Sequence, residues 1–554
     1  MAKKTKHLHP DDPLYHRDHS RPVTRRDLLK QGFISGTGMV VGGGLFNMLA
    51  YPQYAHASTH LSPDIEALAS SVNCNIAGGG VGKIPFICFD LGGGANLAGS
   101  NVLVGTNGQM DAMSEGGYSK MGVPSSMIPG TSSLGMTEGI GNGVLNPSAN
   151  NDFTNGELGL KFHQDSAMLF GILERFKNIK TNPGTTDGTV IPARSGNDTG
   201  NNPHNPMYGI AKAGAIGDVV TLVGSQNTTS GGRSLSPTGL IDLNIRPTKV
   251  DRPSDVTGMI DVGDLTGVLS RNDVKSVMES MTRISHKKLN RVNTQLATDA
   301  TVKDLVRCGY IKAADIAVKF AGVPVDPAKD ARIVDQTVGS GTGIFTQAEF
   351  SGSGEFRKTA SVMKMVLDGH AGAGSISMGG YDYHTGDRST GENRDLRAGR
   401  CIGACLEYAA QMGKPLMIYV FSDGSVASNG ALDGSTDNPG NTGSPLGGRG
   451  KGQWTGDNSS TACSYFLIFN PGGTITVNNN TMADPRQIGR FTSGGSVVTS
   501  ATPAANNVNL LVNTVIANYM SLNGDLAQFA TLFPNHGLGN STAINDLVSF
   551  GPLT

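Results

Sequence analysis

The chain has 554 residues, and its 44 lysines and arginines nearly balance its 45 aspartates and glutamates. A neutral balance of this kind gives no reason to expect nucleic acid as a partner. Glycine is abundant at 77 residues, while aromatic side chains make up only 6%. Hydrophobic runs such as residues 414–421 need burial and exclude a wholly disordered chain. The length allows one large domain or two to three of ordinary size.

The first 57 residues have the layout of an export signal. A basic region reaches Arg25 and Arg26, a weakly hydrophobic, glycine-bearing stretch follows at 34–50, and a small-x-small cleavage site ends at Ala57. The paired arginines followed by an aspartate and two leucines resemble a twin-arginine signal. The alternative is a membrane anchor, but the stretch is short and rich in glycine for the ~20 apolar residues that a span needs.

We therefore predict that residues 1–57 are a signal peptide and that the twin-arginine translocation machinery is a partner during export. The mature protein would be periplasmic or extracellular, without a stable membrane span. Six cysteines occur, without a CxxC pair, so we expect small buried side chains and at most one disulfide.

Segments with strand character alternate with segments of helical spacing along residues 58–554. This order predicts an α/β fold of three layers, with a mostly parallel sheet between helices. No boundary is evident, so we expect a single domain with long polar loop insertions. Strands are expected within 83–96, 215–227, 371–384, 414–430 and 461–473, helices within 159–179, 262–321, 356–370, 394–413 and 499–535, and polar loops at 97–157, 182–206 and 428–461.

Acidic and imidazole side chains lie where several of the predicted strands end. They are Asp90, Asp382 with His384, Asp423 and Asp457. In an open α/β sheet, ligands bind beyond the carboxyl ends of the strands. Carboxylates and imidazole are ligands of zinc, manganese and similar divalent ions. Each piece alone is weak, since an Asp-x-His sequence or an Asp-Gly pair can simply form a turn.

Other sequence features give less support for catalysis. His163 is expected to be a packed or helix-surface residue, and His204 and His536 lie in predicted loops. No GxSxG or HExxH motif occurs, and no Ser-His-Asp set is convincing. The sequence therefore does not identify a catalytic nucleophile, and Ser100, near the first glycine turn, is the candidate considered.

The order of these motifs resembles an exported bacterial family catalogued as domain of unknown function 1501, related in fold to the alkaline phosphatase and sulfatase superfamily. The resemblance covers roughly residues 83–475 and is strongest from Gly379 to Gly424. Its typical parts are an early "GGxD" segment, here "GGAN", a "GG-aromatic-D-x-H" motif, here "GGYDYH", a strand that ends in an acidic residue, and a late "DH" before a strand. It implies an alkaline-phosphatase-like fold.

The resemblance also implies a divalent metal site, with zinc, manganese or calcium as the cofactor. Asp382 and His384 would be ligands, joined by Asp423, Asp457 and, at the early position, Asp90 or Asn96. This chain departs from the pattern, because Asn96 stands where many relatives have aspartate and Asn458 where a late histidine is expected. Asparagine can coordinate only weakly, through its oxygen.

Two hypotheses follow. The first is an exported, metal-dependent hydrolase of phosphate or sulfate esters, with a small-molecule ester as substrate. The second is a non-catalytic envelope binding protein on a degenerate hydrolase fold, with a partner in the envelope. A redox enzyme has only the export route in its favour, because no haem, iron–sulfur, flavin or nicotinamide motif is present.

Overall fold

The computed structural model describes residues 61–72, 74, 82–136, 143–181, 184–196, 202–260, 270–293, 295–320, 324–478 and 482–553. The predicted signal residues Arg25, Arg26 and Ala57 lie outside these ranges. Within them, no helix is both long and apolar enough to cross a membrane.

The described residues divide into two compact units. The first takes in residues 60–74 and 257–323, and the second takes in 75–256 and 324–554. The first unit thus interrupts the second along the sequence. The expected single domain over 58–554 stays a prediction, because such an interruption is compatible with an insertion as well as with a separate domain.

A seven-stranded sheet forms the centre of the second unit, in the order β4-β11-β8-β1-β7-β5-β6. All paired neighbours are parallel except β11, which runs antiparallel to both β4 and β8. The strands of this sheet are β1 (Phe86–Gly92), β4 (Thr186–Pro192), β5 (Val220–Gly224), β6 (Thr248–Lys249), β7 (Ala371–Gly379), β8 (Leu416–Ser422) and β11 (Cys463–Phe469). Two further hairpins pair β2 (Thr154–Leu158) with β3 (Leu160–His163) and β9 (Val426–Asp433) with β10 (Lys451–Asp457).

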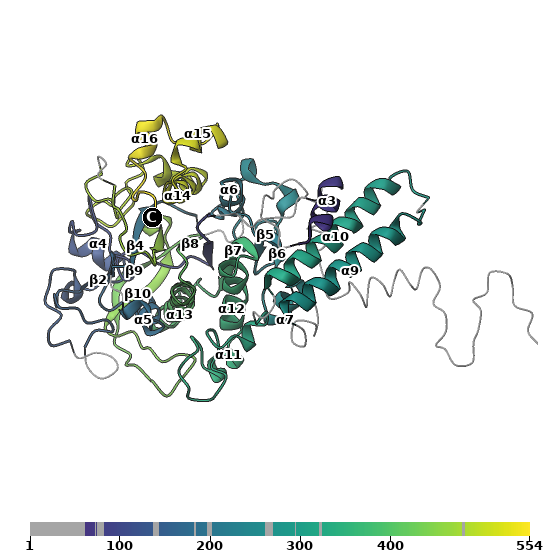
Figure 1. Ribbon diagram of the computed structural model, residues 1–554. Coiled ribbons are helices and arrows are strands. Elements are labelled where there is room, and N and C mark those ends of the chain that lie inside the picture. Colours follow the sequence, from purple (N-terminus) through teal and green to yellow (C-terminus); the bar gives the residue numbers. More distant parts are fainter. Residues whose placement is uncertain are drawn as a thin grey trace, which may run out of the picture. The chain divides into compact units, whose positions relative to one another are not determined.

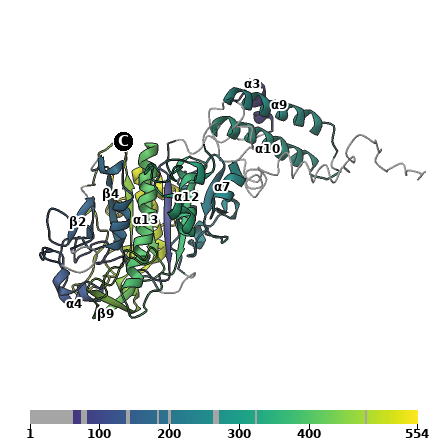
Figure 2. The same cartoon turned by 90° about the horizontal axis from the view of Figure 1, so that it is seen from below.

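Helices cover both faces of the sheet, which makes the three-layer α/β fold that the sequence predicts (Figures 1 and 2). One layer contains α5 (Ala167–Glu174), α12 (Gly354–Leu367) and α13 (Ser389–Met412), and the other contains α6 (Met207–Lys212) and α14 (Val508–Leu522). The remaining helices of this unit are α4 (Glu115–Lys120), α11 (Gln347–Gly352), α15 (Phe529–Leu532) and α16 (Ser541–Asn545). The 3₁₀ turns are Ser125–Met127, Ile179–Thr181, Thr238–Leu240, Leu243–Ile245, Pro327–Lys329, Pro503–Asn506, Leu526–Gln528 and η7 (Ser459–Thr461).

Small residues let the helices of one layer approach each other closely. A Cβ atom at Gly171 of α5 would lie 2.4 Å from the carbonyl oxygen of Leu396, and one at Gly399 of α13 would lie 2.0 Å from that of Met168. Since no side chain fits there, glycine is required at this crossing. The close crossing fixes α13, which follows the GGYDYH motif, over the sheet. α13 ends at Gly413 in the left-handed conformation, as the sequence predicts.

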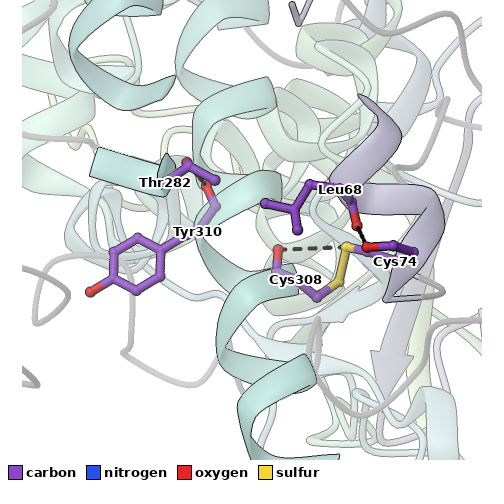
Figure 3. Close-up of a disulfide and its surroundings, with 6 residues drawn as sticks. Leu68, Cys74, Thr282, Cys308 and Tyr310 are labelled. Carbon is purple, nitrogen blue, oxygen red and sulfur yellow. Dashed lines mark hydrogen bonds between the residues drawn. A yellow bond between two sulfur atoms is a disulfide. The ribbon is translucent and has the colours of Figure 1, made fainter. Parts of the chain in front are cut away.

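The first unit is built from α3 (Pro63–Ser71), α9 (Arg271–Leu289) and α10 (Asp299–Phe320). A disulfide joins Cys74 to Cys308 of α10, with their Cα atoms 5.2 Å apart (Figure 3). The other four cysteines are free and buried, so the expectation of at most one disulfide is confirmed. α7 (Pro253–Ile260) lies where the two units join along the chain.

Several local predictions from the sequence are wrong in part, and the polar loops predicted at 97–157 and 182–206 contain the helix α4 and the sheet strand β4, respectively. Residues 159–179 were expected to be one helix, but β3 occupies the beginning and α5 starts only at Ala167. The alternating pattern of Leu160 and Phe162, both buried, pairs this segment with β2 instead. The polar loop 428–461 contains most of the β9–β10 hairpin, whose exposed face explains its polar composition.

Candidate metal centre

The predicted ligands converge on one edge of the sheet. β8, β1 and β7 are parallel neighbours, so their carboxyl ends meet there, and antiparallel β11 begins at the same edge. Asp90 lies in β1, Asp382 follows β7, and Asp423 follows β8. Asp457 ends β10 and is joined to β11 only by the short turn η7. Four segments that are distant in the sequence therefore meet at this edge.

The GGYDYH motif alternates between the interior and the surface. Tyr381 and Tyr383 are fully buried, whereas Asp382 and His384 are exposed. The Tyr383 hydroxyl accepts a hydrogen bond from the backbone amide of Asn96 at 2.9 Å. The centroid of the Tyr383 ring lies 6.2 Å from that of the Trp454 ring. Extended backbone places alternate side chains on opposite sides. The two buried tyrosines thus hold the aspartate and the histidine on the same, outer side.

Asp382, His384 and Asp457 form a group that could hold a metal ion, and one ligand atom from each lies within 4.8 Å of the others. The Nε2 atom of His384 is 2.7 Å from Asp382 Oδ1 and 3.7 Å from Asp457 Oδ1. All three side chains are open to solvent, with exposed fractions of 42% for His384, 63% for Asp382 and 50% for Asp457.

The residues present fit a divalent ion. Ligand atoms around one zinc ion lie about 3.3 Å apart when each is about 2 Å from the metal, and the two distances from His384 bracket this value. One imidazole with two carboxylates suits zinc or manganese, whereas calcium prefers oxygen ligands alone. Three protein ligands leave positions open for water or substrate, as catalytic sites do.

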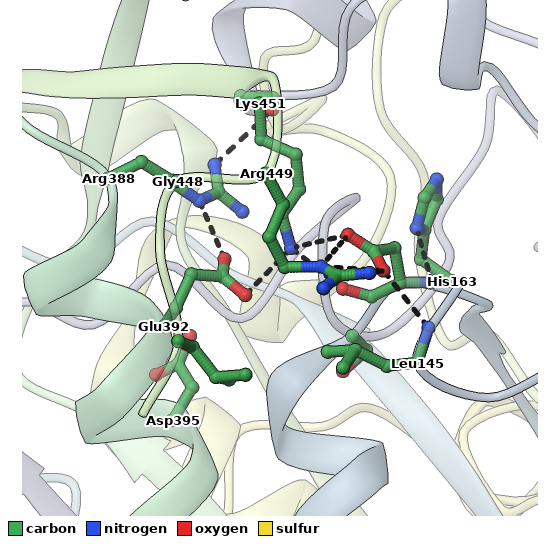
Figure 4. A network of polar contacts seen from close by, with 12 residues as sticks. Leu145, His163, Arg388, Glu392, Asp395, Gly448, Arg449 and Lys451 are labelled. Atoms are coloured by element: carbon green, nitrogen blue, oxygen red, sulfur yellow. Dashed lines mark hydrogen bonds and ion pairs between the residues drawn. The ribbon is translucent and has the colours of Figure 1, made fainter. Parts of the chain in front are cut away.

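A buried ionic network fixes the start of the strand that carries Asp457 (Figure 4). Lys451, the first residue of β10, pairs with Glu392 at 2.7 Å and with Asp165 at 3.2 Å. Arg449 donates to Asp165 from Nη2 at 2.8 Å and also pairs with Asp437. All these side chains are at most 2% exposed. Arg388 forms an ion pair with Glu392 as well. The network thus contains three cations and three carboxylates, so each buried charge has an opposite charge beside it.

The middle of β10 is held against the segment that follows His384. The Trp454 amide donates to the carbonyl of Asp387 at 2.9 Å, and the Gly386 amide donates to the carbonyl of Trp454 at 2.9 Å. The Arg388 guanidinium lies 4.2 Å from the centre of the Trp454 ring. These contacts hold β10 next to the GGYDYH motif. They explain why Asp457 lies close to His384.

Asp423 lies beside this group but does not belong to it. It is fully buried, and its Oδ1 accepts a hydrogen bond from the Gly93 amide at 2.7 Å, while its Oδ2 has no partner. Gly93 has φ +129, and a Cβ atom there would lie 2.3 Å from the amide nitrogen of Asp382. Only glycine fits this conformation and this contact. Gly93 thus links Asp423 to the backbone of Asp382.

Asp90 is also buried, and it holds a loop in place. Its Oδ2 accepts from the amides of Arg233 at 2.6 Å and Ser234 at 2.8 Å, and its Oδ1 accepts from the Ser234 hydroxyl. Burial raises the pKa of Asp90 to about 6, and the charge of Asp423 contributes in the same direction. A role as metal ligand for Asp90 or Asp423 stays a prediction.

The two asparagines are partly engaged by the protein. Asn96 donates from Nδ2 to the carbonyl of Val426 at 2.9 Å, and its buried Oδ1 has no partner. Asn458 caps η7, since its Oδ1 accepts from the Ser460 amide at 2.9 Å and the Ser460 hydroxyl at 2.7 Å. Ser100, the guessed nucleophile, is buried with no partner for its hydroxyl.

Arginine side chains lie close to Gly379 and Gly380, at the end of β7. The sequence did not indicate these arginines as part of the site. A Cβ atom at Gly379 would lie 3.1 Å from Nη2 of Arg233, and one at Gly380 would lie 3.2 Å from Cζ of Arg394. Arg397 donates from Nη2 to the carbonyl of Gly379 at 2.8 Å. Within the described part of the chain, the guanidinium groups of Arg233 and Arg394 have no hydrogen bond or ion pair. Two guanidinium groups without ion pairs to described residues therefore flank the glycines that precede Asp382 by three and two residues.

A buried serine–histidine pair follows β4 and was also missed. The Ser195 hydroxyl lies 2.7 Å from Nε2 of His204, whose ring stacks on Phe421 of β8 with 5.5 Å between centroids. Burial lowers the pKa of His204 to about 3, so the imidazole is neutral at pH 7. The Asn202 side chain donates to the carbonyl of Asp423 at 2.9 Å, which ties this segment to the same sheet edge.

His163 is packed in the interior, in line with one of the two expectations, although it lies on β3 instead of a helix. Its Nε2 is 2.8 Å from the carbonyl oxygen of Met127, and its ring stacks on Phe153. Burial lowers its pKa to about 4. A ligand role for His163 has no support in this geometry.

Comparison of the chain with protein-family models, with curated proteins and with solved structures found no match. The alkaline-phosphatase-like character of the fold and the family resemblance therefore remain predictions from the sequence motifs.

Proposed function

We propose that this protein is an exported, divalent-metal-dependent hydrolase of phosphate or sulfate esters. One observation carries the proposal. A group of one histidine and two aspartates lies at the carboxyl edge of an α/β sheet, and two arginines without ion pairs to described residues flank the glycines just before Asp382. Metal ligands next to guanidinium groups suit a substrate that carries a tetrahedral oxyanion.

Zinc or manganese would be held by Asp382, His384 and Asp457. The bound ion would act as a Lewis acid toward a phosphoryl or sulfuryl oxygen. Arg233 and Arg394 would bind the remaining anionic oxygens and orient the ester, because a guanidinium donates two parallel hydrogen bonds to such a group. Calcium fits less well, because an imidazole is one of the three ligands.

Export by the twin-arginine route, with a periplasmic or extracellular destination, is part of the same proposal. The Cys74–Cys308 disulfide supports it, because disulfides persist in oxidising compartments and are rare in the cytoplasm. The resemblance to the exported family of unknown function is consistent with this destination.

The second candidate is a non-catalytic envelope binding protein on the same fold. Two observations favour this candidate. Asp90 accepts hydrogen bonds from the loop at Arg233 and Ser234, and Asn458 caps η7. Both residues are predicted ligands that already serve the protein itself. A single exposed metal site could then bind an anionic partner without turning it over.

The deciding test is metal content by inductively coupled plasma mass spectrometry. The exported wild type is compared with Asp382→Ala/His384→Ala and with a control, Asp111→Ala/Glu157→Ala, which removes two exposed carboxylates elsewhere in the second unit. We expect stoichiometric zinc or manganese in the wild type and the control only. Absence of metal from all three folded proteins would contradict the proposal.

A screen of phosphate and sulfate esters then separates the two candidates. Turnover that depends on the added metal, and that falls at least tenfold in Arg233→Ala/Arg394→Ala, supports the hydrolase. Bound metal without turnover of any ester supports the binding protein.

A further inference from the structure

The loop end of the helical hairpin in the first unit combines exposed aliphatic side chains with unmatched positive charge. α9 and α10 pack side by side as the two arms of this hairpin (Figure 1). Ile284, Val292 and Leu296, near and within the connection, are 54%, 46% and 56% exposed. Residues 284–298 contain Lys287, Lys288 and Arg291 but no acidic residue. We name residues 284–298 the hairpin tip.

Four cations along the arms of the hairpin, Lys275, Arg283, Lys303 and Arg307, pair with carboxylates. Lys303 pairs with Asp299 at 2.6 Å, and Arg283 pairs with Asp64 at 2.6 Å. Lys287, Lys288 and Arg291, in contrast, are exposed and have no ion pair with a described residue. Positive charge is therefore concentrated at the tip and neutralised along the arms.

We propose that the hairpin tip docks on the surface of a membrane that contains anionic phospholipids. Lysines and arginines near such a surface are attracted to its negative potential, and exposed aliphatic side chains enter the boundary between headgroups and acyl chains. The tip supplies both kinds of group within 15 residues, and its aliphatic side chains would leave water on docking. No helix among the described residues could instead span the bilayer.

Two other occupants fit the tip less well. A nucleic acid would use aromatic side chains for stacking, and residues 284–298 contain no Phe, Tyr or Trp. An acidic protein would match the cations but would gain little from three exposed aliphatic side chains in one 15-residue segment, since protein interfaces need a larger contiguous area. The lipid surface uses both features. The inference does not depend on the proposed hydrolase activity.

The test is flotation of the full chain with vesicles of phosphatidylcholine alone or of equal parts phosphatidylcholine and phosphatidylglycerol. We expect binding only to the anionic vesicles, weakened by added salt. Lys287→Gln/Lys288→Gln should reduce the partition coefficient roughly fivefold for each lysine removed. Ile284→Ser/Val292→Ser, which keeps every charge, should leave weaker binding that salt abolishes completely.

The matched control is Lys180→Gln/Arg490→Gln, which changes the net charge equally through two exposed cations of the second unit. It should bind like the wild type. Failure of the wild type to float with anionic vesicles at low salt would overturn the proposal. Equal binding by the wild type and the lysine variant, or equal losses in the lysine variant and the control, would also overturn it. Circular dichroism and thermal midpoints verify that each variant is folded.

Discussion

Asp165 and Arg449 form an enclosed ion pair between segments that are 284 positions apart in the sequence. The Asp165 side chain is 0% exposed and that of Arg449 is 1% exposed. The charges of Arg449 and Lys451 hold the pKa of Asp165 below its usual value, against the effect of burial. This pair connects the loop before β10 to the segment before α5, and so contributes to the position of Asp457.

Breaking this pair should destabilise the second unit strongly. Arg449→Met leaves the Asp165 and Asp437 carboxylates with one cation fewer in the interior, and removing one partner of a buried pair costs about 3–5 kcal/mol. Urea denaturation measures the change. Arg490→Met, at an exposed arginine, is the comparison and should cost less than about 0.5 kcal/mol. Equal stabilities of the two variants would contradict a structural role for the network.

Metal binding should stabilise the folded protein through the exposed group. At about a hundredfold excess of zinc or manganese over Kd, a ligand specific to the native state adds about 2.7 kcal/mol. The thermal midpoint of the wild type should therefore rise with added metal. Asp382→Asn/His384→Gln should show no rise, because two of its three ligands are lost. A rise of the same size in this variant would mean that the metal binds elsewhere.

Asp395 should make stability depend on pH. It is fully buried, accepts a hydrogen bond from the Asn101 side chain at 2.8 Å, and burial raises its pKa to about 7. The native state then holds its proton more tightly than the unfolded chain, whose aspartates titrate near 3.9. Its contribution to stability is complete below about pH 4 and is lost as the pH rises to about 7, by at most about 1.4 kcal/mol per unit.

Asp395→Asn tests this dependence, because asparagine is similar in shape and does not ionise. Relative to the wild type, the variant should gain unfolding free energy steadily between about pH 4 and pH 7, and the gain should level off above that. Urea denaturation at several pH values gives the difference. A difference that is constant with pH would show that Asp395 titrates as in the unfolded chain.

Reduction of the Cys74–Cys308 disulfide should loosen the first unit. The bond fixes the segment after α3 to α10, and removal of a native disulfide typically costs 2–5 kcal/mol. Amide hydrogens of α9 and α10 should exchange faster in Cys74→Ala/Cys308→Ala, whereas those of β1 and β8 should be unaffected. Faster exchange in the central strands as well would mean that the two units unfold together.

The central strands could be predicted because a strand that is buried on both faces appears in the sequence as a nearly continuous hydrophobic run. The segments that form β8 and β11 are hydrophobic except for one serine each and are buried at every position, and parallel strands follow from their alternation with helices. The grouping of Asp382 and His384 with Asp457 was part of the ligand set that the family resemblance implied, although β10, which carries Asp457, was not predicted as a strand. The structure shows in addition that Asp90 and Asp423 are buried and accept hydrogen bonds from backbone amides.

The arginines could not be predicted, since nothing local marks them. Arg233 follows two glycines in a loop, and Arg394 lies on a helix with several other charged residues. Their shared surroundings arise only when β5, β7 and α13 come together. The Ser195–His204 pair is equally invisible, because its residue types are common in polar loops. Long-range packing, which short motifs do not encode, decides these contacts.

The bond between Cys74 and Cys308 closes a covalent ring that contains four strands of the central sheet, β1, β4, β5 and β6, and the two early polar segments around residues 97–157 and 182–206. A protease that cuts one peptide bond anywhere inside this ring opens the ring but does not divide the molecule. The chain would keep its full mass until a reductant reached the bond. Outside the cytoplasm, where proteases meet few reductants, a nicked copy would thus retain both halves of the sheet.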